Sequence, residues 1–142
     1  MTQTNWSSSI SIPKFEPKTI PDFDPVFGSL DSITFTLTGQ VQGNAGFESR
    51  DNTPATVTLD MSALIRLQRP DASDLWFSVP TASVTESVAA FDDVIDFAGY
   101  SGRTYTGLAQ STTSSVTTLL PSDLSLFIGS GNIILPVTAK GF

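Results

Sequence analysis

Apolar and small polar side chains alternate along most of this chain, and this period of two constrains the fold more than any other feature. The clearest example is the segment 33–41, where threonines separate Ile33, Phe35 and Leu37. Successive side chains of a β-strand point to opposite faces, so the alternation predicts strands with one buried and one exposed face. Similar alternation predicts further strands at 57–67, 75–79, 82–88 and 133–139.

The strands predict an all-β protein, an antiparallel two-sheet β-sandwich of the Ig-like or jelly-roll-like kind. No helical crossover separates them, and antiparallel strands at this spacing close into two packed sheets. Pro121 and Ser122 indicate one short helix near 122–128, with Ser122 as its N-cap. The length of 142 residues suits one domain, so we expect a single β-sandwich over 1–142.

Three stretches interrupt the alternation. Residues 43–46 contain two glycines, and residues 90–107 are irregular throughout, so both predict breaks between strands. The stretch 13–25 contains four prolines, which exclude a central strand and favour an edge or a long connection.

The sequence contains no histidine and no cysteine. Histidine is the side chain whose free pKa lies closest to neutral pH and is the commonest metal ligand, while cysteine supplies thiol nucleophiles and soft-metal ligands. Their absence excludes thiol catalysis, Cys/His zinc sites and a histidine-based triad. We therefore expect a non-enzymatic protein, without a cofactor unless calcium binds.

The formal net charge is −7, and the seven basic residues are scattered along the chain. Phosphate contacts need clustered lysine and arginine, so we expect no nucleic-acid partner. No apolar run approaches the roughly 18 residues of a transmembrane helix, so we expect no direct membrane span.

Three aspartates, Asp92, Asp93 and Asp96, form the best candidate metal site. Calcium takes several oxygen ligands from carboxylates and carbonyls, and an irregular loop with Gly99 and Ser101 can supply both. The favoured alternative is a turn in which the aspartates accept hydrogen bonds from neighbouring backbone N–H groups. Two carboxylates could also serve glycoside hydrolysis, but nothing in the sequence indicates the cleft that this chemistry needs.

For two further candidate binding sites, an ordinary structural role is the favoured explanation. Asp22 and Asp24 could form a second calcium site, although the prolines beside them already indicate a turn. Trp76 and Tyr100 lie off the inward pattern and could stack on sugar rings. Packing under a loop or on the second sheet is the favoured alternative, because large aromatic side chains are mostly buried.

A series of short motifs runs in order along nearly the whole chain. Its members include Asn5-Trp6, Ile12-Pro13-Lys14-Phe15, Phe27-Gly28-Ser29-Leu30, Phe47-Glu48-Ser49, Arg69-Pro70-Asp71, Ile95-Asp96-Phe97, Tyr105-Thr106-Gly107-Leu108 and Leu135-Pro136-Val137. Together they resemble the choice-of-anchor E domain, a family of exported bacterial proteins found notably in cyanobacteria and proteobacteria. The resemblance implies an extracellular or cell-surface structural role and carries over no catalytic residue.

The family's name reflects C-terminal anchors that vary between members, PEP-CTERM signals among them. Members usually begin with a signal peptide and continue past the Pro-Val strand into a final strand, and this chain shows neither. From that difference we expect a sandwich with an open groove. Its unpaired backbone groups would accept a strand from a neighbouring copy.

The segment 1–15 is the candidate donor strand, and Trp6, Ile10 and Ile12 are its candidate anchors because they fall on one face. Head-to-tail contacts of this kind do not close, so they predict a filament. The alternative is that 1–15 pairs within its own chain as an edge strand. We therefore expect a self-assembling extracellular structural subunit, or alternatively a monomeric cell-surface module that binds calcium or glycan.

Overall fold

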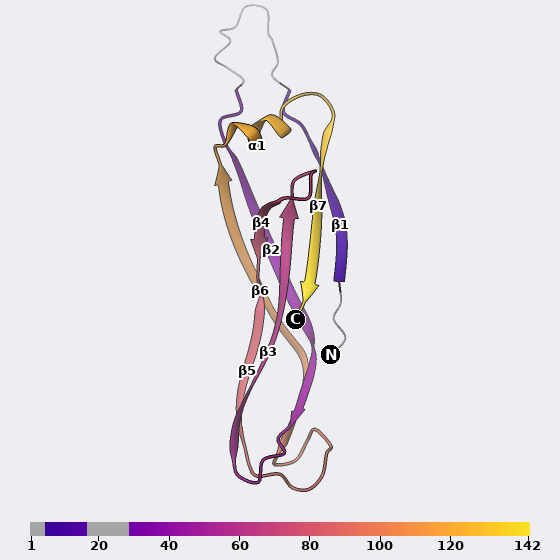
Figure 1. The fold of residues 1–142 in the computed structure, drawn as a ribbon, viewed down its shortest axis with the longest axis vertical. Coiled ribbons are helices and arrows are strands. Elements are labelled where there is room, and N and C mark those ends of the chain that lie inside the picture. Colours follow the sequence, from indigo (N-terminus) through magenta and orange to yellow (C-terminus); the bar gives the residue numbers. More distant parts are fainter. Residues whose placement is uncertain (1–4, 17–28) are drawn as a thin grey trace, which may run out of the picture.

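The computed structural model describes residues 5–16 and 29–142, which form a long, narrow β-sandwich with a short helix at one end (Figure 1). The prediction of an all-β, antiparallel two-sheet sandwich is confirmed. The helix α1 spans Pro121–Leu126. The strands are β1 (Asn5–Pro13), β2 (Ile33–Glu48), β3 (Ala55–Gln68), β4 (Asp74–Ser78), β5 (Thr81–Val88), β6 (Gly102–Thr118) and β7 (Asn132–Gly141).

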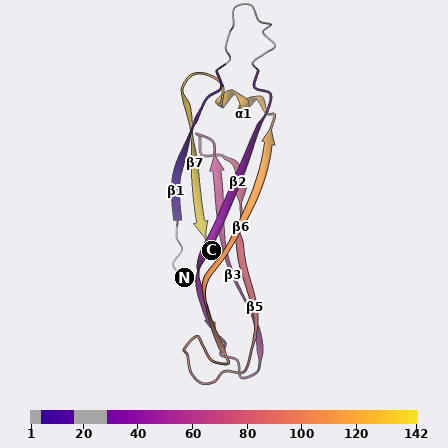
Figure 2. The same ribbon diagram turned by 180° about the vertical axis from the view of Figure 1, so that it is seen from behind.

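The strands form two antiparallel layers. The first sheet runs in the order β1-β7-β3-β4, and β5 pairs with β3 beyond the point where β4 ends. The second sheet is a two-stranded ribbon of β2 and β6. Figure 2 shows this ribbon in front of β3, with β1 and β7 to one side.

The long strand β3 belongs to two tiers of the sandwich. Its residues 63–67 pair with β7 and residues 65–68 pair with β4, so the first sheet is four strands wide there. Its residues 55–62 pair with β5, and among the described residues no strand pairs with the other edge of 55–61. The lower tier therefore has two strands in each layer.

The main core lies in the upper tier, next to α1. Leu135 is completely buried, and the rings of Phe35 and Phe127 pack with their centroids 5.6 Å apart. Each large apolar side chain buried in this way stabilises the fold by about 1.5–3 kcal/mol. The cluster consists of Phe35, Leu67, Phe127, Ile133, Leu135 and Val137.

The helix α1 differs from the prediction at its start, because Ser122 is not the N-cap. Leu120 holds that position with an extended backbone and no side-chain hydrogen bond to the helix. Pro121 follows at the first helical position. Its fixed φ suits a helix there, and a backbone N–H at this position would have no partner within the helix. In the described ranges no helix is long and apolar enough to cross a membrane.

Both strands of the ribbon extend further than the sequence pattern predicted. Residues 43–46 remain within β2, because a bulge opposite Asn44 accommodates an extra residue of β6. The Asn44 side chain accepts the N–H of Gly107 at 2.8 Å, and Gly107 has a φ of 69° that favours glycine. The irregular segment predicted at 90–107 is also shorter than expected, because β6 already begins at Gly102.

Candidate functional site

The strand β1 lies at the edge of the first sheet, and β7 is its partner. The register pairs Trp6 with Ala139 and Ile10 with Leu135. Because residues directly opposite each other share a face, the candidate anchors Trp6, Ile10 and Ile12 lie on the same face as the core residues of β7. The structure therefore places the segment 5–13 in its own chain as an edge strand.

The three candidate anchors differ in burial. Ile12 packs against the core cluster, whereas Trp6 and Ile10 are 55% and 46% exposed although they face inward. The cause is the unequal width of the two sheets, because the two-stranded ribbon does not reach over β1 (Figure 2). The sandwich is consequently open along the side that β1 forms.

The opposite side of the sandwich is closed by hydrogen bonds between β4 and β6. The indole N–H of Trp76 donates to the Ser114 hydroxyl at 2.9 Å, and the Ser78 hydroxyl donates to the Thr112 carbonyl at 3.2 Å. Trp76 is thus half-buried and packed between the sheets, as the favoured structural alternative proposed. Tyr100, the other aromatic candidate, is 78% exposed.

Among the described residues, main-chain hydrogen bonds hold β1 along one edge only, the edge that faces β7. Ser62 and Phe142 exchange two main-chain hydrogen bonds of 2.9 Å. This pair sets the alternation along β7: the backbone N–H and C=O groups of its even-numbered residues point toward β3, and those of its odd-numbered residues point toward β1. Ser11 and Ile134 therefore form a pair between bonded rungs, where Cα atoms lie about 4.5 Å apart. Both side chains are exposed.

The outer face of the first sheet contains a shallow depression of about 560 Å³ beside the start of β1. Two of its lining residues, Arg66 and Lys140, are cations, and none is an acid. Arg66 Nε lies 3.6 Å from Asp74 Oδ2, but both side chains are more than 40% exposed, so solvent weakens this ion pair. The lining consists of Asn5, Trp6, Ser7, Leu64, Arg66, Thr138, Ala139 and Lys140.

The predicted calcium ligands lie on an exposed loop at the opposite end of the molecule from α1. Asp92 Oδ1 accepts the N–H of Val94 at 3.1 Å, and Asp96 Oδ1 accepts the N–H of Ala98 at 2.9 Å. These are the turn contacts of the favoured alternative. In the part of the chain that the structure describes, no three acidic side chains are grouped to hold a metal ion. Calcium binding by Asp92, Asp93 and Asp96 stays a prediction, and Asp22 and Asp24 lie outside the described residues.

Sequence reasoning missed the residue that fixes this loop, Glu48 at the end of β2. Its Oε2 accepts the N–H of Phe97 at 2.7 Å, and its Oε1 accepts the hydroxyl of the fully buried Ser101 at 2.6 Å. A side chain at Gly102 would collide with the Glu48 carboxylate. The one sequence signal was an acidic residue at the end of an otherwise uncharged strand. Its partner Ser101 lies 53 residues further along the chain, so nothing local links the two.

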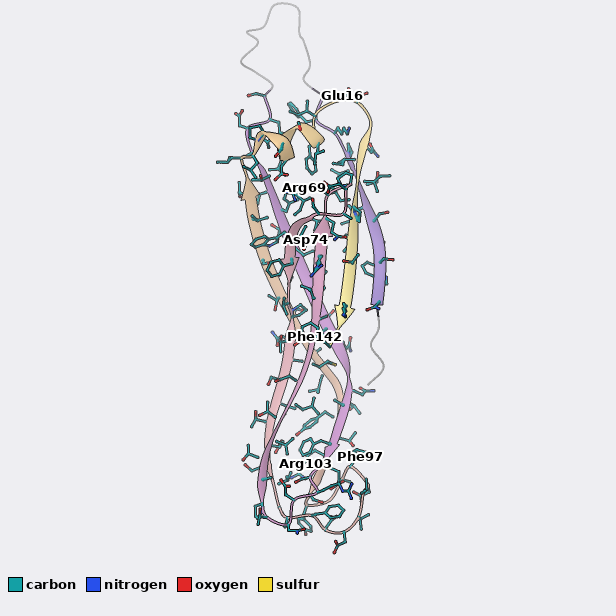
Figure 3. The ribbon with its side chains drawn as sticks, in the orientation of Figure 1. Glu16, Arg69, Asp74, Phe97, Arg103 and Phe142 are labelled. Atoms are coloured by element: carbon teal, nitrogen blue, oxygen red, sulfur yellow. The ribbon has the colours of Figure 1, made fainter. Side chains whose placement is uncertain are left out.

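Sequence reasoning also missed the ion pair between Arg69 and Asp123, which joins the turn after β3 to α1. Nε donates to Oδ1 at 2.6 Å and Nη2 donates to Oδ2 at 3.1 Å, while the Thr118 hydroxyl donates to Oδ2 at 2.9 Å. The hydrogen bond from Arg69 holds the pKa of Asp123 below its ordinary value, although burial opposes this shift. The hydrogen bond to Asp123 likewise raises the pKa of Arg69, which Figure 3 labels near the helical end. This ion pair therefore stabilises the packing of α1 against the turn after β3.

Comparisons with family models, with curated proteins and with solved structures found no match. The resemblance to the choice-of-anchor E domain stays a prediction. Two features of the geometry remain as candidates for function: the edge strand β1 beside the open side of the sandwich, and the basic depression on the outer face.

Proposed function

We propose that this protein is an exported structural subunit of a surface or matrix filament, and that neighbouring copies are joined by exchange of β1. The observation that carries the proposal is the attachment of β1, which pairs along one edge and exposes all of its residues except Ile12. A neighbour's β1 would make the same contacts with β7 as the chain's own β1. Exchange therefore changes which copy supplies β1 and leaves the contacts between β1 and β7 unchanged.

The connection between β1 and β2 favours this exchange. It comprises residues 14–32 and includes Pro17, Pro21 and Pro25. A fully extended chain of this length can span at most roughly 65 Å. That reach would allow β1 to pair with β7 of an adjacent copy.

The ribbon edges also support association. Natural edge strands usually carry charges that prevent pairing with other sheets, but residues 33–47 and 104–118 contain no charged side chain. Their outer face carries hydroxyl pairs instead, among them Thr36 and Ser115 at 2.9 Å. The expected extracellular location rests on the family resemblance and on this charge-poor surface.

An engineered disulfide tests strand exchange directly. The chain has no cysteine, so a double variant Ser11→Cys/Ile134→Cys contains a single possible bridge between β1 and β7. Paired residues between bonded rungs are close enough for a disulfide. If β1 exchanges, oxidation of the assembled protein gives a covalent ladder on a non-reducing gel, because each bridge links two copies.

The matched control is Thr36→Cys/Ser115→Cys, which bridges two strands of one ribbon and is expected to give only intramolecular bridges. Negative-stain microscopy of the unmodified protein should show fibres of constant width. Fibres whose Ser11→Cys/Ile134→Cys bridges are all intramolecular would refute exchange. A monomer at every concentration would refute the filament itself.

A further inference from the structure

The loop of residues 91–100 carries a cluster of exposed apolar side chains. Val94, Ile95, Phe97 and Tyr100 are between 46% and 78% exposed, and they lie within seven consecutive residues. Single exposed apolar residues are normal on a protein surface, but a contiguous group marks an interaction site. Figure 3 shows Phe97 at the end of the molecule that is remote from Glu16 and α1.

Hydrogen bonds tie this loop to β2 and β6. Besides the Glu48 contacts, the Thr104 hydroxyl donates to the Phe97 carbonyl at 2.9 Å, and Arg103 Nη1 donates to the Gly99 carbonyl at 2.8 Å. Asp93 and Phe97 adopt φ values of 67° and 57°, which cost energy for residues with a side chain. An exposed loop held this firmly would lose little conformational entropy on binding.

The loop is acidic as well as apolar, because Asp92, Asp93 and Asp96 accompany the apolar residues. The depression on the outer face of the first sheet has the opposite charge, with Arg66 and Lys140 in its lining and no acid. In an acidic protein of net charge −7, a depression lined by two cations complements the loop, although the exposed ion pair with Asp74 partly neutralises Arg66. Complementary charges of this kind set the partner and the register of an interface.

We propose that the loop 91–100 of one copy docks in the Arg66/Lys140 depression of the next copy. The inference rests on the proposed self-assembly, but it uses a surface separate from the β1–β7 ladder. The loop lies at one end of the molecule, and the depression lies near Phe142, midway along it (Figure 3). Where two copies do not dock into each other reciprocally, the contact is heterologous, and its repetition extends a chain of copies in one direction.

Charge reversal on the two surfaces tests this contact. Lys140→Glu puts an acid into the depression, and Asp93→Lys puts a cation on the loop at an aspartate for which the structure shows no side-chain hydrogen bond. Sedimentation velocity in low salt should show about tenfold weaker association for each variant alone. A mixture of the two variants restores association, because the reversed depression meets the reversed loop and the remaining surfaces are native.

Two variants with the same charge change at other places are the controls. Lys14→Glu lies beyond the end of β1 that is remote from the depression, and Asp60→Lys lies on β3; neither should weaken association. Circular dichroism melts confirm that every variant folds. Association of the unmodified protein should also weaken in 0.5 M sodium chloride, because salt screens exposed charges.

The docking contact would be refuted if Lys140→Glu associated like the unmodified protein, or if the mixture associated no better than its components. The disulfide ladder keeps this result separate from strand exchange. A ladder from Ser11→Cys/Ile134→Cys that persists without any rescue by mixing would leave exchange standing and remove the docking contact. Rescue by mixing without a ladder would remove strand exchange and leave the docking contact standing.

Discussion

Replacing Asp123 by asparagine tests the energetic role of the Arg69–Asp123 ion pair. Asp123 is 4% exposed, and its carboxylate accepts three hydrogen bonds from Arg69 and Thr118. Removing one partner of a buried ion pair costs about 3–5 kcal/mol. Arg69 keeps its bond to the Asp74 carbonyl at 2.6 Å and is about a quarter exposed, so we expect the lower end, about 3 kcal/mol.

The expected change in melting temperature follows from the size of the domain. Unfolding entropy is about 2.1 cal/mol/K per residue, or roughly 0.3 kcal/mol/K for a chain of 142 residues. A loss of about 3 kcal/mol therefore lowers Tm by about 10 °C. Circular dichroism during a thermal scan at pH 7 measures this difference, and Asp60→Asn, an exposed site, should change stability by less than about 0.5 kcal/mol.

The pH dependence of Asp123→Asn gives a second measurement. The pKa of Asp123 is lowered in the folded state, so its contribution to stability is present above the unfolded pKa of about 3.9. That contribution is lost as the pH falls through the folded-state pKa. The difference in Tm between the native protein and the variant should be constant near neutral pH and narrow below about pH 4. A difference of the same size at pH 7 and pH 2 would refute the reasoning.

Three further substitutions have definite expected outcomes. Gly39→Ala would place a Cβ 2.6 Å from Ile65 Cδ1, so overpacking should cost about 1–3 kcal/mol in a denaturant titration. Tyr105→Phe removes a buried hydroxyl that has no hydrogen-bond partner among the described residues, so Tm should not fall. Glu48→Gln weakens the loop contacts, and hydrogen exchange at the Phe97 amide should accelerate while the core amides stay protected.

The period of two in the sequence predicted the sandwich because burial on one face of a sheet leaves a direct local pattern. Alternation places Ile133, Leu135 and Val137 on one face, and they are the centre of the observed core. The glycines at 43 and 46 predicted a break that is absent from β2, because a bulge lets this strand continue past them. Local pattern cannot reveal how a partner strand accommodates an extra residue.

The sites show where sequence reasoning ends. Arg69 and Asp123 are 54 residues apart and meet only because α1 packs over the turn after β3. The open side of the sandwich depends on the widths of the two sheets, and alternation fixes which face is buried but not how many strands lie in each layer. The basic depression likewise unites Arg66 and Lys140 through the pairing of β3 with β7, a long-range register.

The pairing of Asn5 with Lys140 means that the described ends of β1 and β7 lie together at the same end of their ladder (Figure 1). Tension applied to both ends of one chain would therefore peel the two strands apart one rung at a time, which takes little force. Tension that reached β1 from another copy, along the axis of the strand, would load all rungs in shear. The same nine-residue strand would then yield easily within a copy and resist strongly between copies.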